Sequence, residues 1–191
     1  MDADLLTKKL KDLRNTFEQE EQLLTDLDRA IGDGDHGVNM LRGFKAVDEK
    51  ISGDTLSEVL KSTGMTLMSS VGGASGPLYG FSFVKMASLN YDEINQDNLK
   101  EYIDEFKNAV ATRGKVSGGE KTMYDVLQKT SEYLENNQSI SKEQLQQFAD
   151  DTKDLEATKG RAAYFKKDSI GHIDPGAQSM VFVLNALSED V

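Results

Sequence analysis

The stretch from Asp28 to Asn39 contains the residues of this chain that are best suited to chemistry. Three carboxylates, Asp28, Asp33 and Asp35, fall within eight residues, and three glycines and His36 lie among them. Carboxylates held close together repel one another and raise each other's pKa, so core packing gives no reason for this cluster. Mg²⁺ prefers a few carboxylate oxygens and leaves room for water and phosphate oxygens. We therefore interpret the stretch as a Mg²⁺–phosphate loop.

Three better known sites with glycines or carboxylates do not match this loop. Gly32-x-Gly34-x-x-Gly37 has the spacing of the dinucleotide fingerprint, but a helical pattern precedes it where that fingerprint requires a strand. An EF-hand needs Glu at the twelfth position of a loop beginning at Asp33, and Phe44 stands there. The chain contains no P-loop sequence. Catalysis at this loop would therefore be electrostatic, with a metal, backbone N–H groups and a cation around a phosphoryl group.

Three further glycine-rich breaks also lie just before predicted helices, at residues 72–76, 115–120 and 168–176. The N-terminus of a helix exposes backbone N–H groups and its dipole favours an anion, so these breaks indicate a phosphate or nucleotide ligand. Among the basic residues beside them, Arg161 has the setting expected of a guanidinium that contacts phosphate. The others are expected to be solvated helix ends, and they are Arg113, Lys115, Lys121 and Lys159.

The two histidines of the chain, His36 and His172, both fall in glycine-flanked turns. His36 closely follows Asp33 and Asp35, and neighbouring carboxylates favour the protonated imidazolium. We therefore predict a cationic His36 that contacts phosphate rather than a metal.

Composition narrows the class of protein. The chain has 22 basic and 33 acidic residues and a net charge of −11, which opposes binding to nucleic acid or to an anionic membrane. It has no cysteine, so disulfides and Cys-based zinc sites are excluded. No apolar run approaches the roughly 18 to 20 residues of a membrane span, and the N-terminus lacks the pattern of a signal peptide. The sequence predicts a soluble, cytoplasmic domain.

Apolar residues recur at three- and four-residue spacing along most of the chain, which is typical of amphipathic helices. We expect a helix from about Asp4 to Gln22, followed by a separate short helix that carries Asp28 to the loop. The segment Leu78–Leu89 is apolar nearly all round, so we place it at the centre of the fold. Other helices are expected at about residues 38–47, 55–70, 99–114, 123–134, 142–158 and 177–187.

These elements predict an all-α fold with no convincing strand. About eight helices with short connections favour antiparallel neighbours in a bundle or closed barrel. Nothing marks an internal boundary, so residues 1–191 are expected to form a single domain, which is long enough to bury a core without disulfides.

Five blocks of the sequence resemble the L subunits, or L domains, of the dihydroxyacetone kinase family. They follow the family's order and are spread over most of the chain. One block departs from the family, because Gly118-Gly-Glu stands where the family usually has Pro-Gly-Asp before Lys-Thr-Met. The blocks are Leu27-Asp-x-x-Ile-Gly-Asp-Gly-Asp-His-Gly-Val-Asn-Met40, Gly64-Met-Thr-Leu-Met-Ser-Ser-Val-Gly-Gly-Ala-Ser-Gly-Pro-Leu-Tyr-Gly80, Arg113-Gly-Lys115 with Lys121-Thr-Met123, Lys159-Gly-Arg161, and Ile170-Gly-His-Ile-Asp-Pro-Gly-Ala177.

The resemblance implies an eight-helix barrel that binds ADP or ATP at one end, with two Mg²⁺ ions bridging the phosphates. It implies that Asp28, Asp33 and Asp35 are the metal ligands, and that His36 and Arg161 complete the catalytic set. Met123 would provide an apolar face for adenine. The nucleotide contacts that the resemblance implies are His36, Gly37, Val38, Asn39, Ala74, Ser75, Gly114, Met123, Arg161, Asp174, Pro175 and Gly176.

The resemblance also implies partners. In this family dihydroxyacetone is bound covalently by a separate K subunit. A free-standing L subunit resembles the bacterial kinases driven by the phosphotransferase system, where bound ADP is recharged by a phosphohistidine M subunit. The chain would then pass a phosphoryl group from M to dihydroxyacetone on K. The alternatives are the nucleotide-binding domain of an ATP-dependent glycerone kinase or of a fatty-acid kinase system, and a non-catalytic nucleotide sensor.

Overall fold

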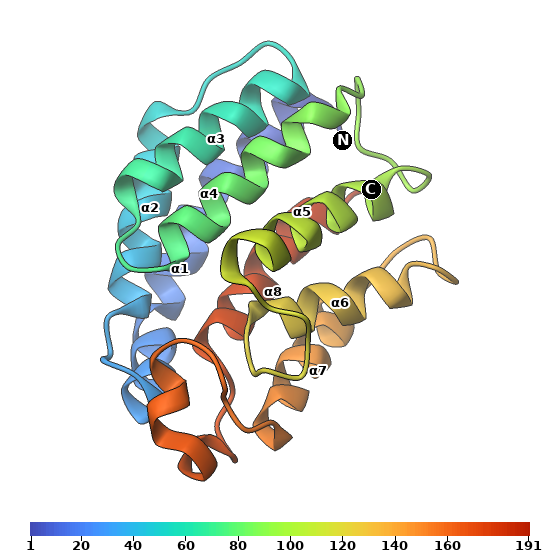
Figure 1. Ribbon diagram of the computed structural model, residues 1–191. Coiled ribbons are helices and arrows are strands. Elements are labelled where there is room, and N and C mark those ends of the chain that lie inside the picture. The colour runs from blue at the N-terminus through green and yellow to red at the C-terminus, as the bar shows by residue number, and fades with distance from the viewer.

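Regular secondary structure is entirely helical in the computed structural model of the chain, which describes residues 1–191 (Figure 1). Eight α-helices are present and no strand forms, as the sequence predicts. No helix combines the length and the apolar character that a membrane crossing requires. The helices are α1 (Ala3–Ile31), α2 (His36–Lys50), α3 (Leu56–Ser70), α4 (Ser75–Met86), α5 (Leu99–Gly114), α6 (Met123–Tyr133), α7 (Lys142–Asp150) and α8 (Pro175–Ser188), with the 3₁₀ segments η1 (Ala87–Leu89), η2 (Asp151–Asp154) and η3 (Arg161–Ser169).

The α-helices form a closed ring. Each packs against the next along the chain, and α8 packs against α1 to complete the circuit. The connections alternate between the two ends of the ring, so neighbouring helices run antiparallel (Figure 1). The connections after α1, α3, α5 and α7 lie toward the left and the lower part of Figure 1, away from both chain termini. The four glycine-rich breaks therefore meet at one end of the fold.

The first helix is continuous over 29 residues, so the two helices expected in this region are one. Its buried stripe has a gap between Phe17 and Leu24. In the structure Gly37 of α2 covers this gap, because a Cβ on Gly37 would lie only 2.2 Å from the carbonyl oxygen of Glu21. The two backbones approach so closely that no apolar side chain is needed there. The helix therefore continues and carries Asp28 in its last turn.

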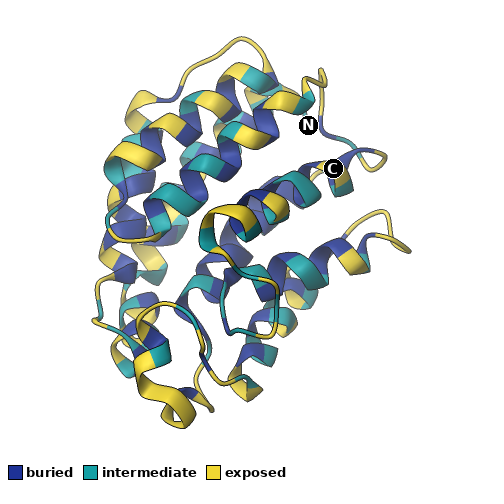
Figure 2. Cartoon of the chain, in the orientation of Figure 1, coloured by how far each residue is buried: buried dark blue, intermediate teal, exposed yellow.

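The most buried helix is α8, not the 78–89 segment that the sequence placed at the centre. Twelve of the fourteen residues of α8 are buried, and it packs against α1, α2, α6 and α7 (Figure 2). Helix α4 lies between α3 and α5, and Leu78, Phe81 and Val84 are only half-buried. The outward ring of Phe81 is flanked by the cations of Lys85 and Arg113, 5.4 and 6.0 Å from its centroid. Charged side chains thus cover apolar surface that was expected to lie in the core.

One hydrophobic core of 40 buried residues fills the ring. Phe17 of α1 stacks on Phe44 of α2 with ring centroids 4.7 Å apart, and Phe182 of α8 meets Phe17 edge-on at 5.8 Å. Helices α3 and α4 approach through two glycines, since a Cβ on Gly80 would lie 2.6 Å from the carbonyl oxygen of Gly64. Aromatic packing and close backbone contact therefore position the helices that end at the glycine-rich breaks.

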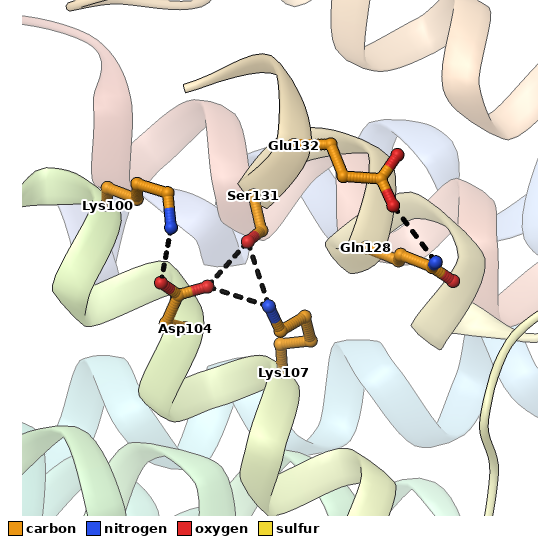
Figure 3. A network of polar contacts seen from close by, with 6 residues as sticks. All are labelled: Lys100, Asp104, Lys107, Gln128, Ser131 and Glu132. Atoms are coloured by element: carbon orange, nitrogen blue, oxygen red, sulfur yellow. Dashed lines mark hydrogen bonds and ion pairs between the residues drawn. The ribbon is translucent and has the colours of Figure 1, made fainter. Parts of the chain in front are cut away.

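A polar network joins α5 to α6 (Figure 3). Lys100 and Lys107 contact Asp104 at 2.7 and 2.8 Å, and the hydroxyl of Ser131 on α6 donates to the same carboxylate. Partial burial would raise the pKa of Asp104, but the hydrogen bonds from these three residues outweigh it and lower the pKa to about 2. The ionised carboxylate therefore links two helices that end or begin at the glycine-rich end of the ring.

Candidate functional site

A cavity of about 500 Å³ lies at the end of the ring where the glycine-rich breaks meet. Its walls come from the ends of α1 and α5, the beginnings of α2, α4, α6 and α8, and the segment between η2 and α8. Most residues that the sequence assigned to a nucleotide site lie on these walls. They are Asp28, Asp33, Asp35, His36, Asn39, Ala74, Ser75, Gly114, Met123, Arg161, Asp174, Pro175 and Gly176.

Two residues of the predicted set, Gly37 and Val38, are not brought to the cavity. Gly37 packs against α1, and the side chain of Val38 is exposed. The physical reason is that successive residues of an α-helix point about 100° apart. A helix that begins at His36 therefore turns His36 and Asn39 toward the cavity and the two residues between them away from it.

The three carboxylates of the loop converge in space. Asp28, Asp33 and Asp35 each present an oxygen, and these oxygens lie within 4.8 Å of one another. Asp28 is buried in the last turn of α1, whereas the other two are exposed in the connection. A Cβ on Gly32 would lie 2.2 Å from Oδ1 of Asp28, so glycine leaves the room that this carboxylate needs. All three donors are hard carboxylate oxygens, and this set fits Mg²⁺.

Asp28 also organises the start of α2. Its Oδ2 accepts hydrogen bonds from the backbone N–H of Asp35 at 2.8 Å and of His36 at 3.0 Å. Asp35 is the N-cap residue, but its own side chain makes no capping bond. A carboxylate from the preceding helix therefore satisfies the first N–H groups of α2 and places a negative charge at its positive end. These two bonds hold the backbone of the loop next to the carboxylate cluster.

His36 is neutral rather than cationic, contrary to the prediction from its neighbours. Burial lowers its pKa to about 4, although the Asp28 carboxylate acts in the opposite direction. Its Nε2 lies 2.8 Å from Oγ of Ser179, and its Nδ1 lies 3.3 Å from Oγ of Ser75. The hydroxyl of Tyr79 lies 2.9 Å from the same Ser179 oxygen. The imidazole therefore connects the starts of α2, α4 and α8 through hydrogen bonds and contributes no positive charge.

The start of α4 differs from the other helix starts around the cavity. Asp28 accepts from the first N–H groups of α2, and Thr122 and Asp174 cap α6 and α8 with their own side chains. The N-cap of α4 is Ala74, which has no side chain that could accept such a bond. The N–H groups of the first turn of α4 are therefore the ones left for an anion in the cavity.

Arg161, the first residue of η3, reaches the carboxylate cluster from the segment that packs against the end of α1. One guanidinium nitrogen lies 3.1 Å from Oδ2 of Asp33, and the Arg161 side chain is 71% exposed. Lys159 also lines the cavity and lies 3.6 Å from Glu120. Arg161 therefore stands beside the place where the carboxylates meet, and Lys159 brings a second cation to the wall of the same cavity.

The remaining wall consists of Met123 and the residues that start α8. Met123 is buried, and a Cβ on Gly176 would lie 3.7 Å from its terminal methyl group. The carboxylate of Asp174 caps α8 by accepting from the N–H of Ala177 at 2.8 Å. Burial raises the pKa of Asp174 to about 7, although the Ala177 N–H and the Lys121 ammonium both act to lower it. This wall combines an apolar thioether with a rigid, capped turn.

Sequence reasoning missed several residues of the cavity wall. Lys121 was expected to be solvated, yet it is buried, and Arg113 was expected to be a solvated helix end, yet it lines the cavity. The signal for Lys121 was its place two residues before Met123 in one of the five blocks. The other lining residues that were not anticipated are Ile31, Gly72, Gly73, Pro77, Leu78, Val110, Val116, Thr122, Lys159, Gly160 and Ala162.

Comparison with known proteins identifies the class of this fold. Residues 30–189 match the DAK2 domain, and the chain belongs to that family. A relative from Listeria innocua, named PEP-dependent dihydroxyacetone kinase 1, ADP-binding subunit DhaL, is 42% identical over 191 residues, covering 97% of this chain and 96% of its own. A relative from Escherichia coli, named PEP-dependent dihydroxyacetone kinase, ADP-binding subunit DhaL, is 41% identical and covers 90% of this chain and 89% of its own. These relatives confirm the resemblance seen in the five blocks.

A solved structure shares the fold. The dihydroxyacetone kinase from C. freundii, in complex with AMP-PNP and Mg²⁺, superposes with a TM-score of 0.75 at 22% identity. The match covers all of this chain and 34% of that longer chain. About a third of that longer chain therefore shares the fold of the ring of eight helices.

Proposed function

We propose that residues 1–191 form the ADP/ATP-binding subunit of a phosphoenolpyruvate-dependent dihydroxyacetone kinase. One observation carries the proposal: three carboxylates converge beside an uncapped helix start in a cavity of about 500 Å³. The cavity belongs to a chain that is 40–42% identical to three bacterial subunits named as ADP-binding. The whole chain would act as a single nucleotide-binding domain.

In this proposal Asp28, Asp33 and Asp35 hold Mg²⁺ beside the phosphates. The bound ions would neutralise phosphate charge and fix the orientation of the transferring group. The chain's own part is to hold the three carboxylates in place. Asp28 does so through its hydrogen bonds to the backbone of α2, and Gly32 does so by leaving space for that carboxylate.

The phosphates would lie against the start of α4. Ala74 and Ser75 offer uncapped backbone N–H groups there, and Asn39 stands next to them on the wall of the cavity. Arg161 supplies a guanidinium from the other side, where it would stabilise charge on the transferring group. His36 would act by orienting Ser75, because its imidazole is buried and neutral.

The nucleoside would occupy the rest of the cavity. Met123 presents a polarizable thioether to the adenine, and Gly114 leaves space at the end of α5. The turn Asp174–Gly176 completes this wall, and its backbone is held by the cap of α8. The adenine face is apolar and the phosphate face is charged, which matches the two ends of ADP.

Two partners follow from this assignment. A K subunit would present dihydroxyacetone at the mouth of the cavity, and an M subunit would present a phosphohistidine there. Beside that mouth most of η3 is exposed (Figure 2). Tyr164 is 86% accessible there, and Phe165 is partly accessible. Lys166 and Lys167 follow directly, so this segment offers aromatic anchors and positive charge in an otherwise acidic chain. We place the subunit and its partners in the cytoplasm.

The metal assignment is tested by Asp33→Asn, with Asp26→Asn as the matched control. Asp26 is an exposed carboxylate on α1 that pairs with Arg29 and lies outside the cluster. Native mass spectrometry should show Mg²⁺-dependent retention of ADP by the wild type and the control, and its loss in Asp33→Asn with unchanged helical circular dichroism. Retention of ADP by Asp33→Asn would show that the ligand set is wrong.

The activity is tested with purified components. Phosphoryl transfer to dihydroxyacetone should require this chain, a K subunit, a phosphorylated M subunit and catalytic ADP. Transfer from free ATP without M would instead indicate an ATP-dependent kinase. Tight nucleotide binding without any transfer would indicate a sensor.

A further inference from the structure

Lys121 has an unusual position for a lysine. It stands directly before the N-cap of α6, its backbone has a positive φ of 61°, and only 1% of its surface is accessible. Its ammonium donates hydrogen bonds to three backbone carbonyl oxygens: that of Thr152 at 2.6 Å, that of Leu155 at 3.1 Å and that of His172 at 2.5 Å. Lys121 is therefore a buried lysine whose ammonium is fully hydrogen-bonded to the backbone, and not the solvated helix end that was expected.

The geometry shows what the ammonium can and cannot do. A protonated lysine has three N–H donors, and here each has its own acceptor. No donor is left for a ligand in the cavity, although the side chain forms part of the wall. Any effect of Lys121 on the cavity must therefore pass through the three segments whose carbonyls it contacts.

Two of these carbonyls stand at the ends of one segment. Residues 156–171, which we call the strap, begin after Leu155 and end before His172. The same ammonium thus holds both ends of the strap together. Two further hydrogen bonds close by have the same effect. The N–H of Gly171 donates to the backbone carbonyl of Lys153 at 2.7 Å, and the N–H of Asp174 donates to the side-chain hydroxyl of Thr152 at 3.0 Å.

The strap carries two cations of the cavity wall. Lys159 and Arg161 line the cavity, and Arg161 reaches Asp33. Between its ends the strap is held by contacts of Thr158 and Lys159 with Glu120, and by a small buried cluster in which Ala157 and Ala162 pack against Ile31. Most of its other residues are exposed (Figure 2). The fastening at its base is therefore one of the few contacts that set where the Arg161 guanidinium lies.

We propose that Lys121 is a positioning residue that closes the base of the strap and thereby holds Arg161 over the carboxylate cluster. Where nucleotide is concerned, this rests on the function proposed above. Lys121 contacts three backbone carbonyls and no ligand. The position of the strap therefore depends on the Lys121 ammonium whether or not a ligand is bound.

The first test removes the ammonium and measures the strap itself. Lys121→Met keeps the aliphatic stem, and Lys115→Met is the matched control, since Lys115 also has a positive φ but is exposed. Hydrogen exchange of the ligand-free chain should be faster in the strap of Lys121→Met, at the amides of Ala157 and Gly171 above all, and unchanged in the control. Unchanged exchange in Lys121→Met would overturn the proposal. This measurement needs no nucleotide, so it stands even if the chain does not bind ADP.

The second test asks whether the effect passes through Arg161. Lys121→Met and Arg161→Gln should each weaken Mg²⁺-dependent ADP binding about tenfold, and the double variant should be no weaker than Arg161→Gln alone. Additive losses would show that Lys121 does not act through Arg161. If wild type fails to bind ADP while strap exchange responds as expected, the proposed function fails and the closure of the strap remains.

The third test replaces the missing atoms. Lys121→Ala lacks the three methylenes and the nitrogen that propylammonium carries, and its backbone at φ 61° is no more strained than that of the lysine. Propylammonium should slow strap exchange and restore ADP affinity in Lys121→Ala, whereas the neutral propanol should not. Should Lys121→Met not fold, this variant refolded with propylammonium gives the same comparison. Equal responses to both additives would overturn the role of the charge.

Discussion

Asp28 supports the start of α2 and is a proposed metal ligand, and two substitutions can separate these roles. Asp28→Ala removes the acceptor of the Asp35 and His36 N–H groups, at 2.8 and 3.0 Å. A hydrogen bond to a charged acceptor contributes about 1.5–3 kcal/mol, so this variant should lose roughly 3–5 kcal/mol of unfolding free energy. Asp28→Asn keeps an amide oxygen that can accept both bonds and should lose only about 1 kcal/mol. Both variants remove the carboxylate and should lose Mg²⁺-dependent ADP binding.

Urea unfolding followed by helical circular dichroism measures the two losses, and isothermal titration measures ADP binding with Mg²⁺. In a chain of this size about 1 kcal/mol shifts the melting temperature by 2–4 °C, so Asp28→Ala should melt about 10 °C lower than the wild type. Equal losses in the Asn and Ala variants would show that charge, rather than a hydrogen-bond acceptor, supports the start of α2. Wild-type stability in Asp28→Ala would refute the capping role, and full ADP binding by Asp28→Asn would refute the metal role.

Two further predictions concern stability away from the cavity. Because the pKa of Asp104 is lowered to about 2, its contribution is complete above the ordinary value of 3.8 and is lost as pH falls toward 2. Asp104→Asn should therefore cost about 1–2 kcal/mol at neutral pH in urea unfolding, allowing for partial exposure, and a cost that stays the same down to pH 2 would contradict this. Gly80→Ala would put a Cβ 2.6 Å from the Gly64 carbonyl and 2.8 Å from the Met68 amide, so we expect a loss of about 2–3 kcal/mol in the same assay. Gly114→Ala, whose Cβ would meet nothing closer than 3.4 Å, is the control, and equal effects of the two would refute the close helix contact.

The helices could be predicted from the sequence because their signals are local. Spacing of apolar residues and the glycine-rich breaks predicted an all-α fold of about eight helices and placed most of them along the chain. The continuity of α1 could not be predicted in this way. The gap in its stripe is covered by Gly37, a residue of the next helix whose lack of a side chain is what lets the backbones touch. Because glycine has no side chain, a close contact between two helix backbones at a glycine adds no apolar residue to the sequence pattern.

The centre of the fold was misplaced for a related reason. The apolar composition of a helix shows that other groups cover its surface. It does not show whether these groups are neighbouring helices or the side chains of charged residues. Phe81 of α4 is flanked by Lys85 and Arg113, whereas α8 is enclosed by four other helices. The two cases look alike in the sequence and differ only in the tertiary arrangement.

The site could be predicted as a set of residues but not in its protonation states. His36 was expected to be charged because of nearby aspartates, and Lys121 was expected to be a solvated helix end because it flanks a glycine-rich break. Burial lowers the pKa of His36 and so keeps its imidazole neutral. The ammonium of Lys121 donates to three backbone carbonyls instead of to water. Desolvation depends on residues distant in the chain, such as Ser179 and His172, so local charge patterns could not reveal it.

The charges of the cavity explain how an acidic chain could take an anionic ligand. The loop between α1 and α2 gathers three carboxylates on one wall, and the strap and the end of α5 bring Arg161, Lys159 and Arg113 to the others. A polyphosphate without a cation would meet the carboxylates at close range, where repulsion is least screened. A divalent ion on the carboxylates removes that repulsion, and a bound phosphate in turn adds oxygen ligands for the ion. Under the proposed assignment each ligand therefore raises the affinity of the other by the same factor, because the coupling between two binding equilibria is reciprocal.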